Sequence, residues 1–95
     1  MYVCGPVWDP AKAKANLEKH GVRFSDAELV LYDPHAVTIE DSTAQGEQRH
    51  ISIGLGAAGQ VLVVVYTYRG DDIRLISARP AARRERQEYE EGIRF

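Results

Sequence analysis

Cysteine is nearly absent from this chain of 95 residues. Because Cys4 is the only one, an intramolecular disulfide and a four-cysteine zinc site are both excluded, and a reducing cytoplasm is the compartment that fits. The longest apolar run, Val61 to Tyr66, is far too short to span a bilayer, and the N-terminus lacks the pattern of a signal peptide. With no linker or repeat, residues 1–95 are predicted to form a single cytoplasmic domain with no membrane contact.

Motifs for metal and nucleotide chemistry are also missing. The sequence contains no H-E-x-x-H, no C-x-x-C and no clustered aspartates, so no metal is expected. It contains no G-x-G-x-x-G and no phosphate loop, and Ser77 lacks the surroundings of a nucleophile elbow. The sequence therefore predicts a site that uses no cofactor.

Positive charge is in slight deficit overall but is unevenly placed. Lys and Arg number 12 and Asp and Glu 14, a net charge of −2 that alone argues against a nucleic-acid binder. Residues 25–48, however, hold six acids and no Lys or Arg, whereas residues 73–86 hold five arginines and one acid, Glu85. The surface is predicted to have a positive and a negative side, and such a surface can bind a phosphate polymer.

Three helices are predicted from their boundary residues. Asp9 caps a helix that begins at Pro10 and ends at His20, before a glycine. Ser25 and Glu28 have the spacing of a capping box and predict a second helix directly after it. A third helix is predicted from Pro80 to about Glu91.

Strands are predicted between the second and third helices. Alternating or continuous apolar residues mark segments 36–40, 49–55, 61–68 and 73–78, and residues 1–8 could add an edge strand. Short glycine-containing turns join the later segments, which favours antiparallel pairing. The predicted fold class is α+β, with an antiparallel sheet of about four to five strands and all helices packed on one face.

The arginines around the last helix are the strongest functional signal. Arg79 is expected at the junction between strand and helix, where Ser77 and the free N–H groups of the helix could receive an anion with it. Arg83 lies one turn further on. Four arginines at a helix start oppose the helix dipole, and a bound anion would relieve that conflict. For Arg84 and Arg86 we favour the alternative of a solvated helix with internal pairs to Glu88 and Glu90.

Two further groups of residues could supply the remaining chemistry. Lys12, Asn16 and Lys19 lie on one stripe of the first helix, and His20 at its end either binds the last carbonyls or acts in proton transfer. Arg49, with Glu47 and His50 beside it, forms either part of a metal-free phosphodiester-cleaving site or an edge-strand salt bridge. Which of His20, His50 and Glu47 transfers protons stays open.

Three segments of the chain carry a family resemblance. WDPAKAKANLEKHGVRF, GEQRHISIG and IRLISARPAARRERQEYEE occur in this order and resemble the BrnT family of bacterial type II toxins. The resemblance implies a RelE-like fold with two N-terminal helices and one C-terminal helix. It implies a metal-independent endoribonuclease that arrests growth, and a BrnA-like ribbon-helix-helix antitoxin that forms an operator-binding complex with it.

The resemblance also implies a set of site residues. They are Arg49, Arg74, Ser77, Arg79 and Arg83, with Lys12, Lys19 and His20 as further members. We expect the first group and His20 to act on the scissile phosphate, and the two lysines to bind RNA. The alternative function is a non-catalytic module whose basic strip docks a partner protein and takes part in operator repression.

Overall fold

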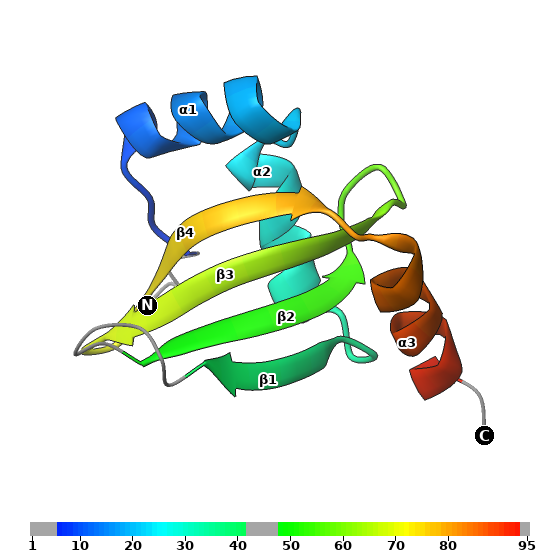
Figure 1. The fold of residues 1–95 in the computed structure, drawn as a ribbon. Helices are drawn as coiled ribbons and strands as arrows, with labels where there is room; N and C mark the ends of the chain where they lie inside the picture. Colours follow the sequence, from blue (N-terminus) through cyan, green and yellow to red (C-terminus); the bar gives the residue numbers. More distant parts are fainter. Residues whose placement is uncertain (1–5, 42–47, 94–95) are drawn as a thin grey trace.

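A computed structural model describes residues 6–41 and 48–93 of the chain and contains one four-stranded sheet (Figure 1). Each strand pairs antiparallel with the next, in the order β1-β2-β3-β4. The predicted α+β class with an antiparallel sheet is therefore confirmed. In chain order the elements are α1 (Pro10–His20), α2 (Phe24–Ala27), the 3-10 helix η1 (Glu28–Tyr32), β1 (Val37–Asp41), β2 (Arg49–Leu55), β3 (Val61–Arg69), β4 (Asp72–Pro80) and α3 (Arg83–Ile93).

The first helix begins and ends where the sequence predicts. The Asp9 carboxylate accepts a hydrogen bond from the backbone N–H of Ala11 at 2.9 Å, and Pro10 is the first helical residue. Gly21 has a φ of 72°, and its N–H donates to the Leu17 carbonyl at 2.8 Å. A residue with a side chain is strained at this φ, so glycine suits the position.

The second helix differs from the prediction. It begins at Phe24, and Arg23 before it provides no side-chain cap. Ser25 therefore lies inside the first turn, and the predicted capping box is wrong. Phe24 is 1% exposed and its ring meets the Trp8 ring edge-on, with centroids 5.9 Å apart. The start of α2 thus coincides with a buried aromatic residue and has no side-chain cap.

The boundary between β4 and α3 also differs. Pro80 is the last residue of β4, paired with Leu62, and α3 begins only at Arg83. The prediction that Pro80 starts the helix is therefore wrong. Pro80 is tolerated because β4 is an edge strand, where a missing N–H removes no ladder hydrogen bond.

The helices cover both faces of the sheet, which corrects the one-face expectation. Leu62 and Val64 of β3 belong to the core cluster formed with α2 and η1, on what we call the α2 face. Val63, which points the other way, packs with Ile53 and with Tyr89 of α3, on what we call the α3 face. None of the helices within the described ranges is long and apolar enough to cross a membrane.

The predicted N-terminal edge strand is present only as a bridge. Val7 pairs in parallel with β4, donating to the Ile73 carbonyl at 2.8 Å and accepting from the Leu75 N–H at 3.0 Å. The rest of that prediction, residues 1–5, lies outside the described residues.

Candidate functional site

A single asparagine attaches α1 to the outer edge of β4. The side-chain amide of Asn16 donates to the Ala78 carbonyl at 2.8 Å and to the Val22 carbonyl at 3.0 Å. Its oxygen accepts from the Ala78 N–H at 3.0 Å. Asn16 is 6% exposed, so these hydrogen bonds are formed away from water. The amide therefore satisfies backbone groups of an edge strand and fixes the position of α1 across it.

The attachment leaves a pocket between α1 and β4 that gathers four of the predicted site residues. The pocket has a volume of about 280 Å³. Lys12, Lys19 and His20 line it from α1, and Ser77 lines it from β4. The His20 imidazole is partly buried and makes no hydrogen bond to the part of the chain that the structure describes. The N–H of Gly21 caps the helix end instead, so the imidazole is not held there as a carbonyl-binding cap.

Arg79 lies on the α3 face and forms an ion pair within the chain. Its Nη1 and Nη2 donate to the two carboxylate oxygens of Glu85, each at 2.8 Å. The Arg79 side chain is still 43% exposed. The hydrogen bonds from Arg79 are the largest cause that lowers the pKa of Glu85, to about 2, and the same contact raises the pKa of Arg79.

Glu85 offsets the unfavourable interaction that the sequence predicts between the arginines at the start of α3 and the helix dipole. Its Oε1 also accepts a hydrogen bond from the Ala82 N–H at 2.8 Å, so one carboxylate serves both the helix terminus and Arg79. The Glu85 carboxylate thus occupies the position where a bound anion was predicted. Arg83, Arg84 and Arg86 are exposed, and the predicted pairs to Glu88 and Glu90 are not formed among the described residues.

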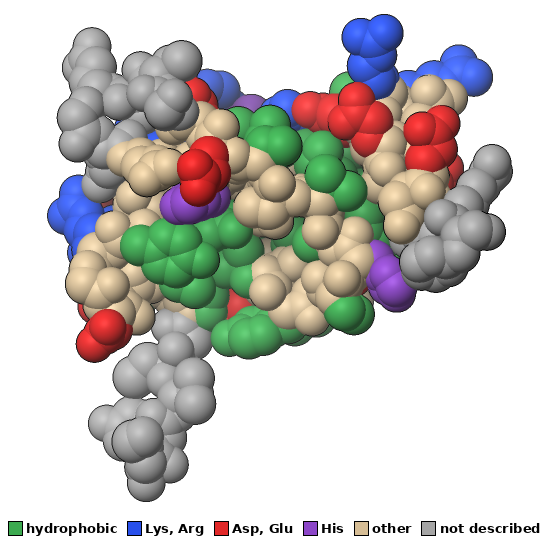
Figure 2. Space-filling model, turned by 90° about the horizontal axis from the view of Figure 1, so that it is seen from below, with side chains coloured by type: hydrophobic (Ala, Val, Ile, Leu, Met, Phe, Trp, Pro, Cys, Tyr) green, Lys and Arg blue, Asp and Glu red, His purple; other side chains and the backbone are tan. Residues whose placement is uncertain are grey.

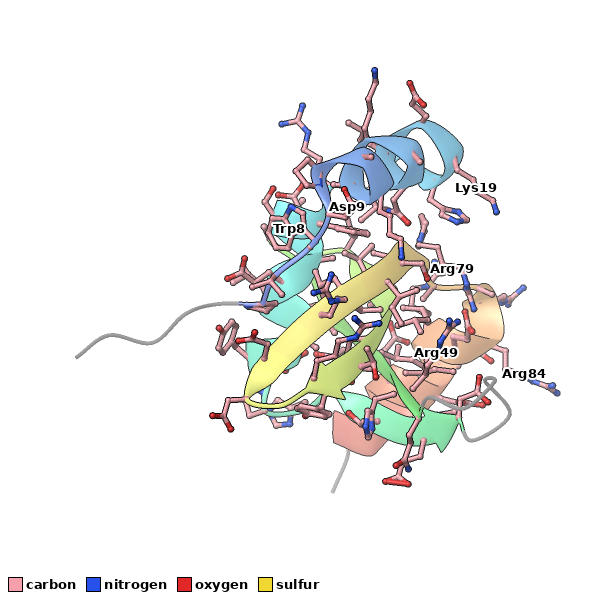
Figure 3. All side chains as sticks on the ribbon, turned by 90° about the vertical axis from the view of Figure 1, so that its left-hand side faces the viewer. Trp8, Asp9, Lys19, Arg49, Arg79 and Arg84 are labelled. Carbon is pink, nitrogen blue, oxygen red and sulfur yellow. The ribbon has the colours of Figure 1, made fainter. Side chains whose placement is uncertain are left out.

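Arg49 and Arg74 lie on the same sheet face as Arg79. In the strand register Arg49 pairs with Thr67, Thr67 pairs with Arg74, and Arg79 pairs with Val63. Thr67 and Val63 are four residues apart on β3, so their side chains share the α3 face. Figure 3 shows Lys19, Arg79 and Arg49 on one side of the sheet, and Trp8 on the other.

His50 lies on the opposite face from these arginines. It follows Arg49 directly on β2, and its ring stacks on Tyr66 with centroids 5.5 Å apart and meets Tyr68 edge-on at 4.9 Å. The sheet therefore separates the His50 imidazole from Arg49 and Arg79. Glu47, the other proton-transfer candidate beside Arg49, lies outside the described residues.

Basic side chains are scarce on the side of the molecule that exposes β1. Figure 2 shows this side, with hydrophobic side chains across its middle and Lys and Arg only toward its margins. The β1 segment itself contains Glu40 and Asp41 and no base. The separation into a positive and a negative side stays a prediction, because this side is mainly hydrophobic and its acidic side chains also lie toward the margins (Figure 2).

The roles of Asn16 and Glu85 in organising the site were not predicted from the sequence. The signal for Asn16 is an asparagine in mid-helix between lysines, a position where this residue is unfavourable unless its amide has partners. The signal for Glu85 is its place three residues after Ala82, the spacing of a carboxylate that accepts from a helix start.

Comparison with known proteins agrees with this geometry and assigns the family. Residues 8–85 match the family model described as ribonuclease toxin, BrnT, of type II toxin-antitoxin system. The fold is similar to the crystal structure of the Brucella abortus ribonuclease toxin, BrnT, with a TM-score of 0.64 and 27% sequence identity over 82% of this chain and 96% of that one. The search of curated proteins gave no match. Since the family model covers most of the sequence, the chain belongs to the BrnT family of ribonuclease toxins of type II toxin-antitoxin systems.

Proposed function

We propose that this chain is a metal-independent endoribonuclease whose cleavage centre is the pocket between α1 and β4. The observation that carries the proposal is the convergence of Lys12, Lys19, His20 and Ser77 on one pocket in a member of a ribonuclease toxin family. Imidazole, ammonium and hydroxyl groups can together move protons and offset charge on a phosphate. RNA carries its own nucleophile, the ribose 2′-OH, so the protein does not need a nucleophilic side chain.

The reaction follows from the roles that these groups can take. Neutral His20 accepts the proton of the 2′-OH as its oxygen attacks phosphorus. The bond between phosphorus and the 5′-oxygen breaks, and the ammonium of Lys12 or Lys19 protonates the leaving oxygen. Ser77 donates a hydrogen bond to a phosphate oxygen, and Arg79, with Arg83 beyond it, offsets the negative charge of the transition state. The products are a 2′,3′-cyclic phosphate and a 5′-hydroxyl.

End-labelled RNA incubated with the purified chain in EDTA tests this proposal. We expect fragments with 2′,3′-cyclic phosphate ends, made by the wild type and lost in His20→Ala, since that variant lacks the proton acceptor. His35→Ala is the matched control, because His35 is an exposed histidine in the loop between η1 and β1. Fragments that appear only with added divalent cations would contradict the metal-independent mechanism. No fragments from any RNA, with or without ribosomes, would favour the non-catalytic binding module.

The family supports the remaining parts of the proposal. A type II toxin has a protein antitoxin, and we propose a BrnA-like ribbon-helix-helix protein that covers the basic site and binds operator DNA in complex with the toxin. The four antiparallel strands and three helices support a RelE-like arrangement in one toxin domain. A cytoplasmic location is part of the same proposal, since the proposed RNA substrate and antitoxin are found there.

A further inference from the structure

Arg49 and Arg74 form a like-charged pair that the cleavage centre does not use. They flank Thr67 in one row across β2, β3 and β4, on the α3 face. Asp41 stands at the β1 end of the same row, beside Arg49, so the row as a whole remains positive. Two guanidinium groups on one face of a sheet, with one strand between them, repel each other, and an anion that lies between them offsets this repulsion.

The two arginines have hydrogen-bond donors that the described part of the chain does not use. The Nε atoms of both arginines are buried, and neither has a hydrogen-bond partner among the described residues. Thr67 between them is 2% exposed, and its hydroxyl donates to the Gln48 carbonyl at 2.8 Å, so it holds the start of β2 beside β3. Buried N–H donors are rarely left unpaired in folded proteins. Both side chains are only partly buried, and guanidinium groups that face the same side of a sheet are suited to the oxygens of one phosphate.

The arginine pair lies close to the proposed cleavage centre. Ser77 pairs with Val65, two residues along β3 from Thr67, so the two rows lie roughly 7 Å apart. That separation is comparable with one nucleotide step of an extended single strand. We infer that Arg49 and Arg74 clamp one backbone phosphate of the RNA, next to the phosphate that is cleaved. The inference rests on the proposed function, and its ligand is single-stranded RNA held through its backbone without base readout.

Salt-dependent binding tests the clamp without any cleavage. The probe is a fluorescent RNA oligonucleotide with 2′-deoxyribose at the cleavage position, titrated with protein at several NaCl concentrations. In Arg49→Gln/Arg74→Gln we expect the slope of log affinity against log salt to decrease in magnitude by about 0.7, the value for one phosphate contact on a single strand. Arg84→Gln removes an exposed charge from α3 and is expected to leave the slope unchanged. An equal decrease in both variants would mean diffuse attraction and would overturn the clamp.

Neutral phosphate analogues locate the contact. A methylphosphonate placed one step from the cleavage position should weaken binding by the wild type, and should cause no further loss in the double variant. A penalty of equal size in both proteins overturns the assignment of this phosphate to the arginine pair. Circular dichroism and thermal unfolding of the double variant show whether it is folded before either result is interpreted.

Cleavage kinetics separate the clamp from the cleavage centre. On RNA of several nucleotides the double variant should have a raised KM and an unchanged kcat, because the clamp holds ground state and transition state alike. On a dinucleotide, which has only the scissile phosphate, it should match the wild type. If no RNA is cleaved by any protein, the proposed function fails, while the binding measurements still decide the clamp. A lowered kcat on the dinucleotide would instead place the pair in the chemistry and overturn the inference.

Discussion

Asn16 and Arg79 show how single side chains decide what the pocket can do. Asn16 contributes no charge, yet its amide holds α1 against Ala78 and so sets where Lys12 and Lys19 stand. Arg79 is half exposed and still ion-paired with Glu85, so it has donors left for a phosphate while its orientation is fixed.

Asn16→Ala should weaken both the fold and the activity. It leaves the N–H and carbonyl of Ala78 and the carbonyl of Val22 without their partner, and we expect the free energy of unfolding to fall by roughly 2–4 kcal/mol. RNA cleavage should fall as well, at temperatures where the variant is still folded, because α1 loses its position. Urea unfolding and cleavage assays measure the two effects, with the exposed substitution Glu18→Ala as control. An unchanged unfolding curve would show that the amide contributes little.

Arg79→Ala and Glu85→Gln together separate phosphate binding from ion pairing. Both substitutions break the same pair, but only Arg79→Ala removes the positive charge. We expect Arg79→Ala to lower kcat/KM by the equivalent of about 2–4 kcal/mol, the loss seen when one transition-state donor is removed. Glu85→Gln should keep activity within a few-fold. Equal losses in the two variants would assign Arg79 a structural role only.

At the scale of elements, residues close in sequence could be predicted and distant contacts could not. The bounds of α1 follow from Asp9, Pro10 and Gly21, which act within a few residues of themselves. The sequence does not predict the end of β4, because proline suits both a helix start and an edge strand, and only the sheet order decides which of the two Pro80 occupies. The pocket brings together residues of α1 and β4. The hydrogen bonds between Asn16 and Ala78 join the two elements across 62 positions of sequence, so no local sequence pattern predicts this contact.

Helix α3 is attached to the rest of the fold by Tyr89. This residue is 3% exposed, and its hydroxyl donates to the Asp33 carboxylate at 2.6 Å. Tyr89→Phe keeps the ring and removes only that hydrogen bond. We expect the free energy of unfolding to fall by about 1.5–3 kcal/mol, the range for a hydrogen bond to a charged group. Urea unfolding at neutral pH measures the loss, and a change below 0.5 kcal/mol would contradict it.

At the scale of the whole molecule, we expect the stability of the fold to decrease at both acidic and alkaline pH, through two residues of α3. Burial is the largest cause, and the bond to Asp33 a further one, that raises the pKa of Tyr89 to about 12. That contribution to stability is full below the ordinary tyrosine pKa of about 10 and is lost as the pH rises through 12. Glu85 affects stability at the acidic end instead, because its pKa in the folded protein is lowered to about 2. Its contribution is present above its ordinary pKa and is lost as the pH falls toward 2.

Unfolding curves between pH 2 and pH 12 check this behaviour. Relative to wild type, Glu85→Gln should be destabilised at neutral pH, and the difference should shrink as the pH falls toward 2. The difference between wild type and Tyr89→Phe should shrink at the alkaline end, and also at the acidic end, where protonation of the Asp33 carboxylate removes the charged acceptor of the Tyr89 hydrogen bond. Differences that stay constant over the whole range would mean that neither group titrates with folding.

The attachment of α1 to β4 has a consequence for synthesis of the protein. A ribosome produces Lys12, Lys19 and His20 early, but the pocket needs Ser77 and the backbone of Ala78 as well. The nascent chain therefore holds no assembled pocket until β4 has been translated and has paired with β3. With the proposed cleavage centre in this pocket, the ribonuclease should be inactive toward its own messenger and ribosome for most of its translation.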